Sequence, residues 1–478
     1  MRTSCIALAL LLAASAHAED TLAPRPQAVG ASRAEGLWLS STLEGGLLER
    51  DLWAGGTLGI GVEHDVIGLH LRAPVYLRGL DLPPETVRSP GVCGVVRCEV
   101  FGVHEDGWEL EGISRVVDEL RLGRPGEALY ARGGPLLVTL GSGRLVERYL
   151  NSPDPDRPQS GLLLHARLPW LGLALEGMVG NLFVPQKLSA LRAEARPLRI
   201  LSFLDGDDPW ARFLGRLALS VEGAGDLVAP TAPHDVTTLH SPAHPVVGGA
   251  VEAAWPFFDE GGVFQLSPFV AGGALYGLSA KGDARAELGL GASAGGRMEL
   301  RAPYVGVRLD GALVVDGPAH RTGVFGLLYE IERKQALVGA AVEGGGVLRV
   351  PAPGGVAYTV AAEAVVVDLL RLGARYRRDS APGGSTGEAY AEVALASFRG
   401  GAHFIRRGIE RVDDVVRWDE RTLVVVEGSV GFWGPLSAFV RYQRAPRFVA
   451  SGLRVDDDVI AGVSLDFVVA SAEDPAGA

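Results

Sequence analysis

The chain has 478 residues, of which 45 are basic and 57 acidic, giving a net charge of −12. An acidic chain without a basic cluster is a poor partner for nucleic acid or for an anionic inner leaflet, so we expect neither as a target. Glycine supplies 65 residues, which disfavours helices, and the mean hydropathy of +0.19 is high for a soluble secreted protein.

The N-terminus has the pattern of an export signal. Arg2 precedes an apolar run over residues 6–14, and Ala16-His17-Ala18 offers small residues at a cleavage site. This arrangement predicts a Sec signal peptide over residues 1–18 rather than a membrane anchor. Residues 19–34 are then expected to form a periplasmic N-terminal segment. No later apolar run reaches the roughly 18 residues of a membrane helix.

Two cysteines remain after the signal peptide, Cys93 and Cys98. In an oxidising periplasm this pair predicts one disulfide that closes a loop. Four residues separate the two, so they do not form a redox Cys-x-x-Cys motif. No second pair completes a zinc site.

The main structural signal is strict alternation along short segments. Val305, Val307 and Leu309 fall on one face of a predicted strand, while Arg308 and Asp310 fall on the other. The same pattern occurs at residues 58–63, 67–72 and 388–398. Each strand therefore has one apolar and one polar face. This predicts either a soluble sandwich with its apolar faces inward or a membrane barrel with them outward.

Three features favour the barrel. The segments are about ten residues long and follow one another as hairpins, as at residues 161–168 and 171–179. Tryptophans such as Trp418 and Trp433 lie near predicted strand ends, where interfacial girdles need them. The last strand, residues 459–467, resembles the closing strand of bacterial outer-membrane proteins. We predict an all-β fold, a single antiparallel barrel of about 18–20 strands over residues 35–468 with a tail over 469–478.

One segment carries a more specific resemblance. Thr139-Leu140-Gly141-Ser142-Gly143, followed by Arg148-Tyr149-Leu150-Asn151, resembles a stretch of uncharacterised bacterial outer-membrane β-barrels, which are porin-like. Those barrels have histidine where Ser142 stands, so no role of that histidine transfers. The resemblance covers about a tenth of the chain and implies location and fold. Residues 141–151 are either an inward turn in the lumen or an ordinary strand end.

Motifs for catalysis and metal binding are weak. Ser293 lies in Gly-Ala-Ser-Ala-Gly, which matches a nucleophile elbow, but the surroundings predict a strand rather than a strand-to-helix turn. His234, His240 and His244 lack the spacing of a zinc site. The acidic runs at 205–208, 413–414 and 456–458 are expected to be charged turns at hairpin tips, with weak calcium or magnesium contacts as the alternative. We expect no catalytic residue, resident metal or cofactor.

The function predicted from the sequence is a porin-like outer-membrane channel for passive passage of small polar solutes. Its partners would be outer-membrane lipid, lipopolysaccharide and those solutes, and assembly into a homo-oligomer is left open. An outer-membrane hydrolase that uses Ser293, a structural barrel and a soluble secreted all-β binding protein are the alternatives. The expected pore-lining residues are Arg72, Arg144, Arg148, Arg308, Asp310, Glu388, Tyr390, Glu392 and Arg441.

Overall fold

The computed structural model describes most of the chain from Gly36 to Ser471. The described residues are 36–48, 51–80, 103–104, 107–108, 116–124, 127–152, 159–168, 172–198, 209–230, 243–257, 263–283, 285–333, 335–338, 341–344, 350–367, 369–379, 383–449 and 452–471. The predicted signal peptide, the segment 19–34 and the predicted disulfide of Cys93 and Cys98 lie outside these residues, so all three stay predictions.

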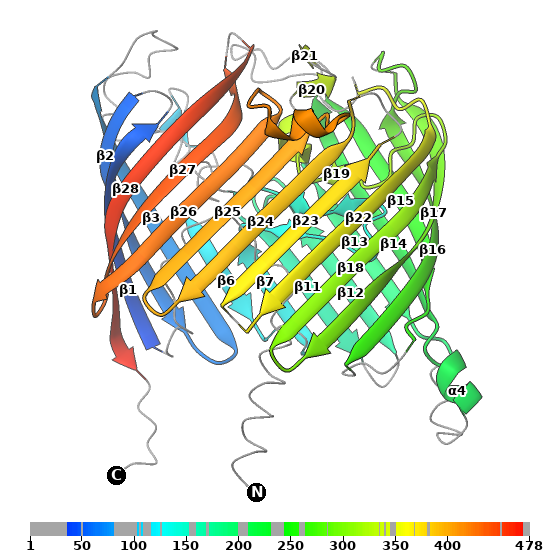
Figure 1. Ribbon diagram of the computed structural model, residues 1–478, viewed down its shortest axis with the longest axis horizontal. Coiled ribbons are helices and arrows are strands. Elements are labelled where there is room, and N and C mark those ends of the chain that lie inside the picture. The colour runs from blue at the N-terminus through cyan, green and yellow to red at the C-terminus, as the bar shows by residue number, and fades with distance from the viewer. Residues whose placement is uncertain are drawn as a thin grey trace, which may run out of the picture.

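Twenty antiparallel strands form one closed barrel (Figure 1). In order around the ring they are β1 (Gly36–Leu48), β2 (Asp51–Glu63), β3 (Ile67–Leu80), β6 (Val117–Leu122), β7 (Leu129–Gly134), β11 (Gly161–Leu168), β12 (Leu173–Val179), β13 (Ser189–Ala195), β14 (Ala218–Pro230), β15 (Ala243–Ala254), β16 (Phe264–Leu278), β17 (Glu287–Ala302), β18 (Val305–Asp316), β22 (Gly355–Val366), β23 (Leu370–Arg378), β24 (Thr386–Leu395), β25 (Phe398–Arg407), β26 (Thr422–Trp433), β27 (Leu436–Val449) and β28 (Gly452–Ser471). The ring closes where β1 pairs with β28, from Gly36 opposite Ser471 to Leu47 opposite Val459.

The alternation in the sequence sets the two faces of the wall. On β18, Val305, Leu309 and Leu313 point outward and are exposed, while Arg308 and Asp310 point inward and form an ion pair. On β2, Leu58 is 67% exposed on the outer face. A closed ring leaves no unpaired strand edge, and its outer apolar band suits lipid. The predicted fold, with the upper value of the expected strand count, is confirmed.

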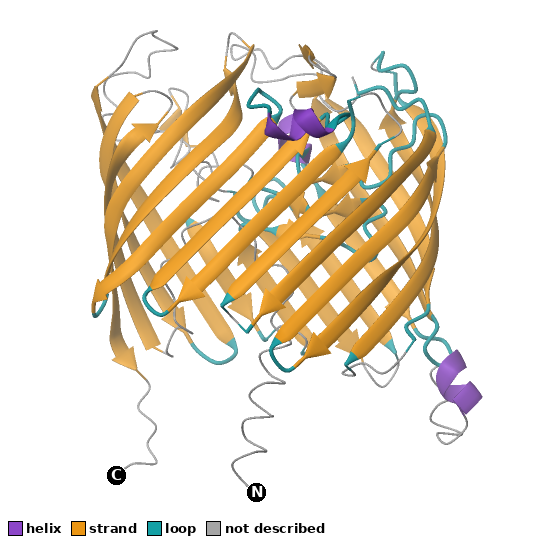
Figure 2. Cartoon of the chain, viewed as in Figure 1, coloured by secondary structure: helices purple, strands orange, loops and turns teal. Residues whose placement is uncertain are grey.

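The two ends of the barrel differ. Connections at the end that carries both termini are mostly short turns, whereas the long connections lie at the other end (Figures 1 and 2). Exposed aromatic side chains at the short-turn end include Tyr304, Phe432 and Trp433, and Trp418 is exposed in a long connection. Aromatic residues at both rims are typical of membrane barrels.

Several boundaries differ from the sequence prediction. The strand predicted over 388–398 ends at Leu395, because Ala396 adopts a positive φ of 49° and begins the turn to β25. The last strand extends from Gly452 to Ser471, so the acidic run 456–458 lies within β28 and the prediction of a charged turn there is wrong. Asp456 and Asp458 point inward and Asp457 outward, as alternation requires.

A few elements lie outside the barrel wall. They are β4 (Val103–His104), β5 (Gly107–Trp108), β8 (Leu137–Val138), β9 (Val146–Glu147), β10 (Tyr149–Leu150), β19 (Phe325–Gly326), β20 (Gln335–Val338), β21 (Ala341–Gly344), α4 (Pro209–Leu214), α5 (Tyr329–Glu332) and η5 (Val412–Val416). Among the described residues, no helix is long and apolar enough to cross a membrane.

Candidate functional site

Two segments fold from strand ends into the barrel interior. The first inward segment, residues 135–152, follows β7 and contains β8, β9 and β10. The second inward segment, residues 317–333, follows β18 and contains β19 and α5. They join where β9 pairs in parallel with β19. Figure 2 shows loops crossing the interior behind the front wall.

The first inward segment contacts strands that are not neighbours in the ring. Glu222 on β14 accepts a hydrogen bond from the Val146 backbone N–H at 3.2 Å. Glu147 forms ion pairs with Arg375 and Arg377 on β23, the latter at 2.5 Å. Because these partners lie on separate arcs of the wall, the segment spans part of the lumen. The sequence left an inward turn and an ordinary strand end open for residues 141–151, and the structure has the inward turn.

The second inward segment is held by a buried polar cluster. Arg333 donates from Nε to Asp226 Oδ2 at 3.0 Å, and the Tyr329 hydroxyl donates to the same oxygen at 2.9 Å. Arg321 bridges Glu332 and Asp379, each at 3.1 Å. These charges are nearly all buried, and each has an opposite partner. Burial makes loss of a single partner costly.

An apolar core fills the space between both segments and the wall. Leu136, Leu145 and Tyr149 of the first segment pack with Phe325 and Tyr329 of the second. Wall residues of β15 and β16, among them Val246 and Leu275, complete this cluster. In this region side chains of the two inward segments cover the inner wall, so the interior is apolar here although the strands carry polar inner faces elsewhere.

Arg148 connects the first inward segment to the opposite wall. Its Nη2 lies 2.5 Å from Glu388 Oε1 on β24, and His403 Nε2 on β25 lies 2.9 Å from the same oxygen. The Arg148 guanidinium also lies 5.7 Å from the centre of the Tyr390 ring. Arg148 itself has a left-handed backbone with φ 52°. Such a conformation is uncommon outside glycine and is held here by the surrounding contacts.

The predicted pore-lining residues fall into two environments. Some keep partial exposure on the inner wall: Arg308 and Asp310 pair at 2.9 Å with side chains 33% and 25% exposed, and Arg72 pairs with Asp118 at 3.4 Å. Most of the others are more buried, either in the first inward segment or on the inner wall, while Glu392 is half-buried. They are Arg144, Arg148, Glu388, Tyr390, Glu392 and Arg441. The structure therefore brings Arg148, Glu388 and Tyr390 together, and places Arg72 elsewhere.

Sequence analysis missed several residues of this network. Arg375 and Arg377 alternate with outward residues on β23, so the criterion that selected Arg308 could have found them. Asp226 lies within β14 and Arg333 caps the short helix α5, so no local pattern shows that the two residues meet. Their pairing joins residues 107 positions apart.

Ser293 does not assemble a catalytic site. It lies within β17 on the inner face, with no strand-to-helix turn beside it. His320 Nδ1 is 2.7 Å from Asp316 Oδ1, but the Ser293 hydroxyl has no hydrogen-bond partner among the described residues. Ser293 and His320 line a shared cavity of only about 10 Å³, which is small for an ester substrate.

The other sequence motifs bring no metal site together. His234, His240 and residues 205–208 lie outside the described residues, and the His244 ring lies 5.8 Å from the Tyr276 ring, tilted by 43°. Asp414 accepts backbone hydrogen bonds from Glu410 and Arg411 near η5. Over the part of the chain that the structure describes, no cluster of three or more His, Cys, Asp or Glu side chains is suited to hold a metal ion.

Asp419 fixes the connection between β25 and β26. Burial alone would raise its pKa, but hydrogen bonds from Arg406 at 2.9 and 3.0 Å, together with Arg421, lower the pKa to about 2. A lowered pKa contributes stability that is present above the unfolded value of about 3.9 and is lost as pH falls through about 2. We expect hydrogen exchange of residues 408–421 to accelerate over this range, and an Asp419→Asn variant to exchange fast at every pH. Constant protection of the unmodified chain down to pH 2 would contradict this.

Glycines on the inner wall let the second inward segment lie directly on the sheet. A Cβ on Gly291 would fall 2.4 Å from His320 Cε1, whereas one on the outward Gly272 would meet nothing closer than 3.7 Å. We expect Gly291→Val to displace His320 and to reduce hydrogen-exchange protection of residues 317–333. Gly272→Val on the adjacent strand is the matched control and should leave protection unchanged. Equal protection in both variants would show that the contact does not hold the segment.

A closed, even-numbered antiparallel barrel with an apolar outer band and aromatic rims defines a class of protein, the transmembrane β-barrels of outer membranes. The chain has the fold of this class.

Comparison with known proteins finds solved structures that align with the chain at low similarity. No family model matches the chain, and no curated protein matches its sequence. OccK5 (OpdH) of Pseudomonas aeruginosa is 10% identical, with a TM-score of 0.32 over 90% of this chain and 98% of that chain. A BenF-like porin from Pseudomonas fluorescens Pf-5 is 9% identical, with a TM-score of 0.30 over 92% and 99%. A mutant of the ferric enterobactin receptor PfeA of P. aeruginosa is 8% identical, with a TM-score of 0.33 over 91% and 81%. The likeness concerns the fold alone.

Proposed function

We propose that the protein is a diffusion channel that admits small polar solutes across the outer membrane. The observation that carries the proposal is the polarity of the wall, with paired arginines and carboxylates inside and aliphatic side chains outside. A lumen lined with charges of both signs holds water and offers sites at which polar solutes exchange hydration for hydrogen bonds.

The two inward segments set the width of this path. Arg308, Asp310 and Arg297 keep exposure to the lumen and would meet passing solutes. Arg148 and Glu388 bind each other and hold the first inward segment in place, so they would set the width of the path rather than select solutes. The proposal includes no catalytic role, since the Ser293 hydroxyl bonds to no histidine in the described structure.

Planar-bilayer recording of the refolded protein tests the proposal. We expect discrete conductance steps in salt solution, and liposomes containing the protein should swell in small sugars faster than in large ones. Purified barrels that insert into the bilayer but never conduct would argue for a structural barrel and against a channel.

Ion selectivity tests the role of the exposed inner charges. Removing the charge of Arg308 with Arg308→Gln leaves Asp310 with Arg297 as its remaining close partner, at 2.8 Å. The path then becomes more negative, and we expect the reversal potential in a salt gradient to shift toward cations. Arg444→Gln also removes one positive charge, but from the outer face, where Arg444 pairs with Asp457 at 2.8 Å. Equal shifts in both variants would contradict a path along Arg308.

A further inference from the structure

Arg144 is a buried cation that forms no direct ion pair with the described residues. It is 8% exposed, and no carboxylate of the described residues lies within 4 Å of its guanidinium. Nε donates to Ser142 Oγ at 3.1 Å and Nη2 to the Ser142 carbonyl at 3.3 Å, while Nη1 has no partner. The Phe269 ring lies 5.4 Å from the guanidinium carbon. Burying an unpaired charge is costly unless something compensates it.

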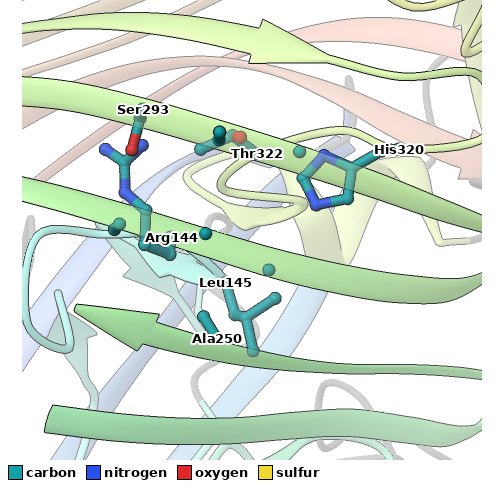
Figure 3. Close-up of a pocket in the computed structure, with 11 residues that line it drawn as sticks. Arg144, Leu145, Ala250, Ser293, His320 and Thr322 are labelled. Carbon is teal, nitrogen blue, oxygen red and sulfur yellow. The ribbon is translucent and has the colours of Figure 1, made fainter.

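Ser293 offers a second buried donor at the same place. Its side chain is 9% exposed, and Oγ has no hydrogen-bond partner. Arg144 and Ser293 both line the cavity of about 10 Å³, together with His320 and Thr322 from the second inward segment (Figure 3). The rest of the lining is glycine, alanine and Leu145, so the two unpartnered donors face a small and otherwise mostly apolar space.

The carboxylates of the surrounding shell are already engaged. Glu147 is shared by Arg375 and Arg377. Glu252 accepts from the Ser142 backbone N–H at 3.2 Å. Asp316 accepts from His320 and from the backbone and hydroxyl of Thr322. Glu147, Glu222 and Glu252 therefore act on the charge of Arg144 only from a distance, and none of the described residues accepts a hydrogen bond from its Nη1.

We propose that this cavity binds a single monatomic anion, chloride in the cell, held by Arg144 Nη1 and the Ser293 hydroxyl. An anion accepts from both donors without needing a hydrogen-bond acceptor in return, whereas water would have to find acceptors for its two protons. The small size of the cavity, about 10 Å³, favours a monatomic anion over sulfate, phosphate or a carboxylate.

The anion has a structural consequence. Arg144 belongs to the first inward segment, Ser293 to the wall, and His320 to the second inward segment. One bound chloride thus ties the first inward segment to β17 and fills the space against which the second inward segment packs, where Gly291 lets His320 lie against the sheet. The site concerns the packing of the barrel interior, so it holds whether or not the barrel conducts.

Bromide crystallography tests the site directly. Crystals of the full refolded chain grown in sodium bromide should show an anomalous peak between Arg144 Nη1 and Ser293 Oγ. An adventitious ion only, meaning peaks at exposed arginines such as Arg285 and none in this cavity, would overturn the proposal, as would a water there without anomalous signal.

Exchange of the anion in solution gives a second test that does not need crystals. Replacing chloride by gluconate at equal ionic strength should accelerate hydrogen exchange of residues 135–152 and 317–333 several-fold, and chloride should reverse the change. Arg144→Gln should exchange at one rate in both salts. Arg301→Gln, which changes a half-exposed arginine on the same strand as Ser293, should keep the chloride response. An unmodified chain that exchanges equally in both salts would overturn the proposal even if every variant failed to fold.

Discussion

Replacing Glu147 by glutamine is expected to release the first inward segment and raise single-channel conductance several-fold. Glu147 is buried and is the shared partner of Arg375 and Arg377, so the neutral variant leaves two arginines facing an amide. Removing one member of a buried ion pair costs about 3–5 kcal/mol because the remaining charge stays desolvated. The cost falls on the contact between the segment and β23 and not on the hydrogen-bonded wall, so the segment should leave the wall rather than the barrel unfold.

The measurement pairs conductance with hydrogen exchange of residues 135–152. Asp457→Asn is the control, because it also breaks an arginine–carboxylate pair, that of Arg444 at 2.8 Å, but on the half-exposed outer face. Such pairs contribute about 0–1 kcal/mol, so conductance and exchange should stay as in the unmodified chain. Faster exchange without a change in conductance would mean that the solute path does not pass the first inward segment.

The wall of the barrel could be predicted from the sequence because apolar and polar residues alternate along each strand. Val305, Leu309 and Arg308 show by their positions alone which side faces lipid, since successive side chains point to opposite faces. Register and closure then follow from hydrogen bonding between neighbours. The predicted strand end near Ala396 was wrong because Ala396 adopts a positive φ and begins a turn. Alanine is not a residue type that predicts this conformation.

The interior could be predicted only in part, because it depends on contacts between distant segments. The glycines and charges at 141–151 suggested an inward turn. Nothing local to Leu145 or Phe325 shows that they share a core, since that core exists only once both segments lie against β15 and β16. Likewise, the sequence around Asp226 shows only a carboxylate on a strand, and its ion pair with Arg333 is seen only in the structure. A glycine on the inner face of a strand can indicate where a loop contacts the wall, as Gly291 does for His320.

The orientation of the wall can be tested with an arginine placed on each face of one strand. Leu58 lies near the middle of β2 with 67% of its surface exposed on the outer face, and Thr57 beside it points inward. Arginine near the bilayer midplane of a barrel costs about 2–4 kcal/mol, whereas a lumen position can leave the guanidinium in water. We therefore expect Leu58→Arg to lose most of its folded, heat-modifiable band in lipid vesicles and to unfold at lower urea concentration. Thr57→Arg should fold to near the level of the unmodified chain. If Thr57→Arg failed to fold and Leu58→Arg folded normally, the apolar residues of β2 would face the interior. That result would contradict a lipid-facing outer wall.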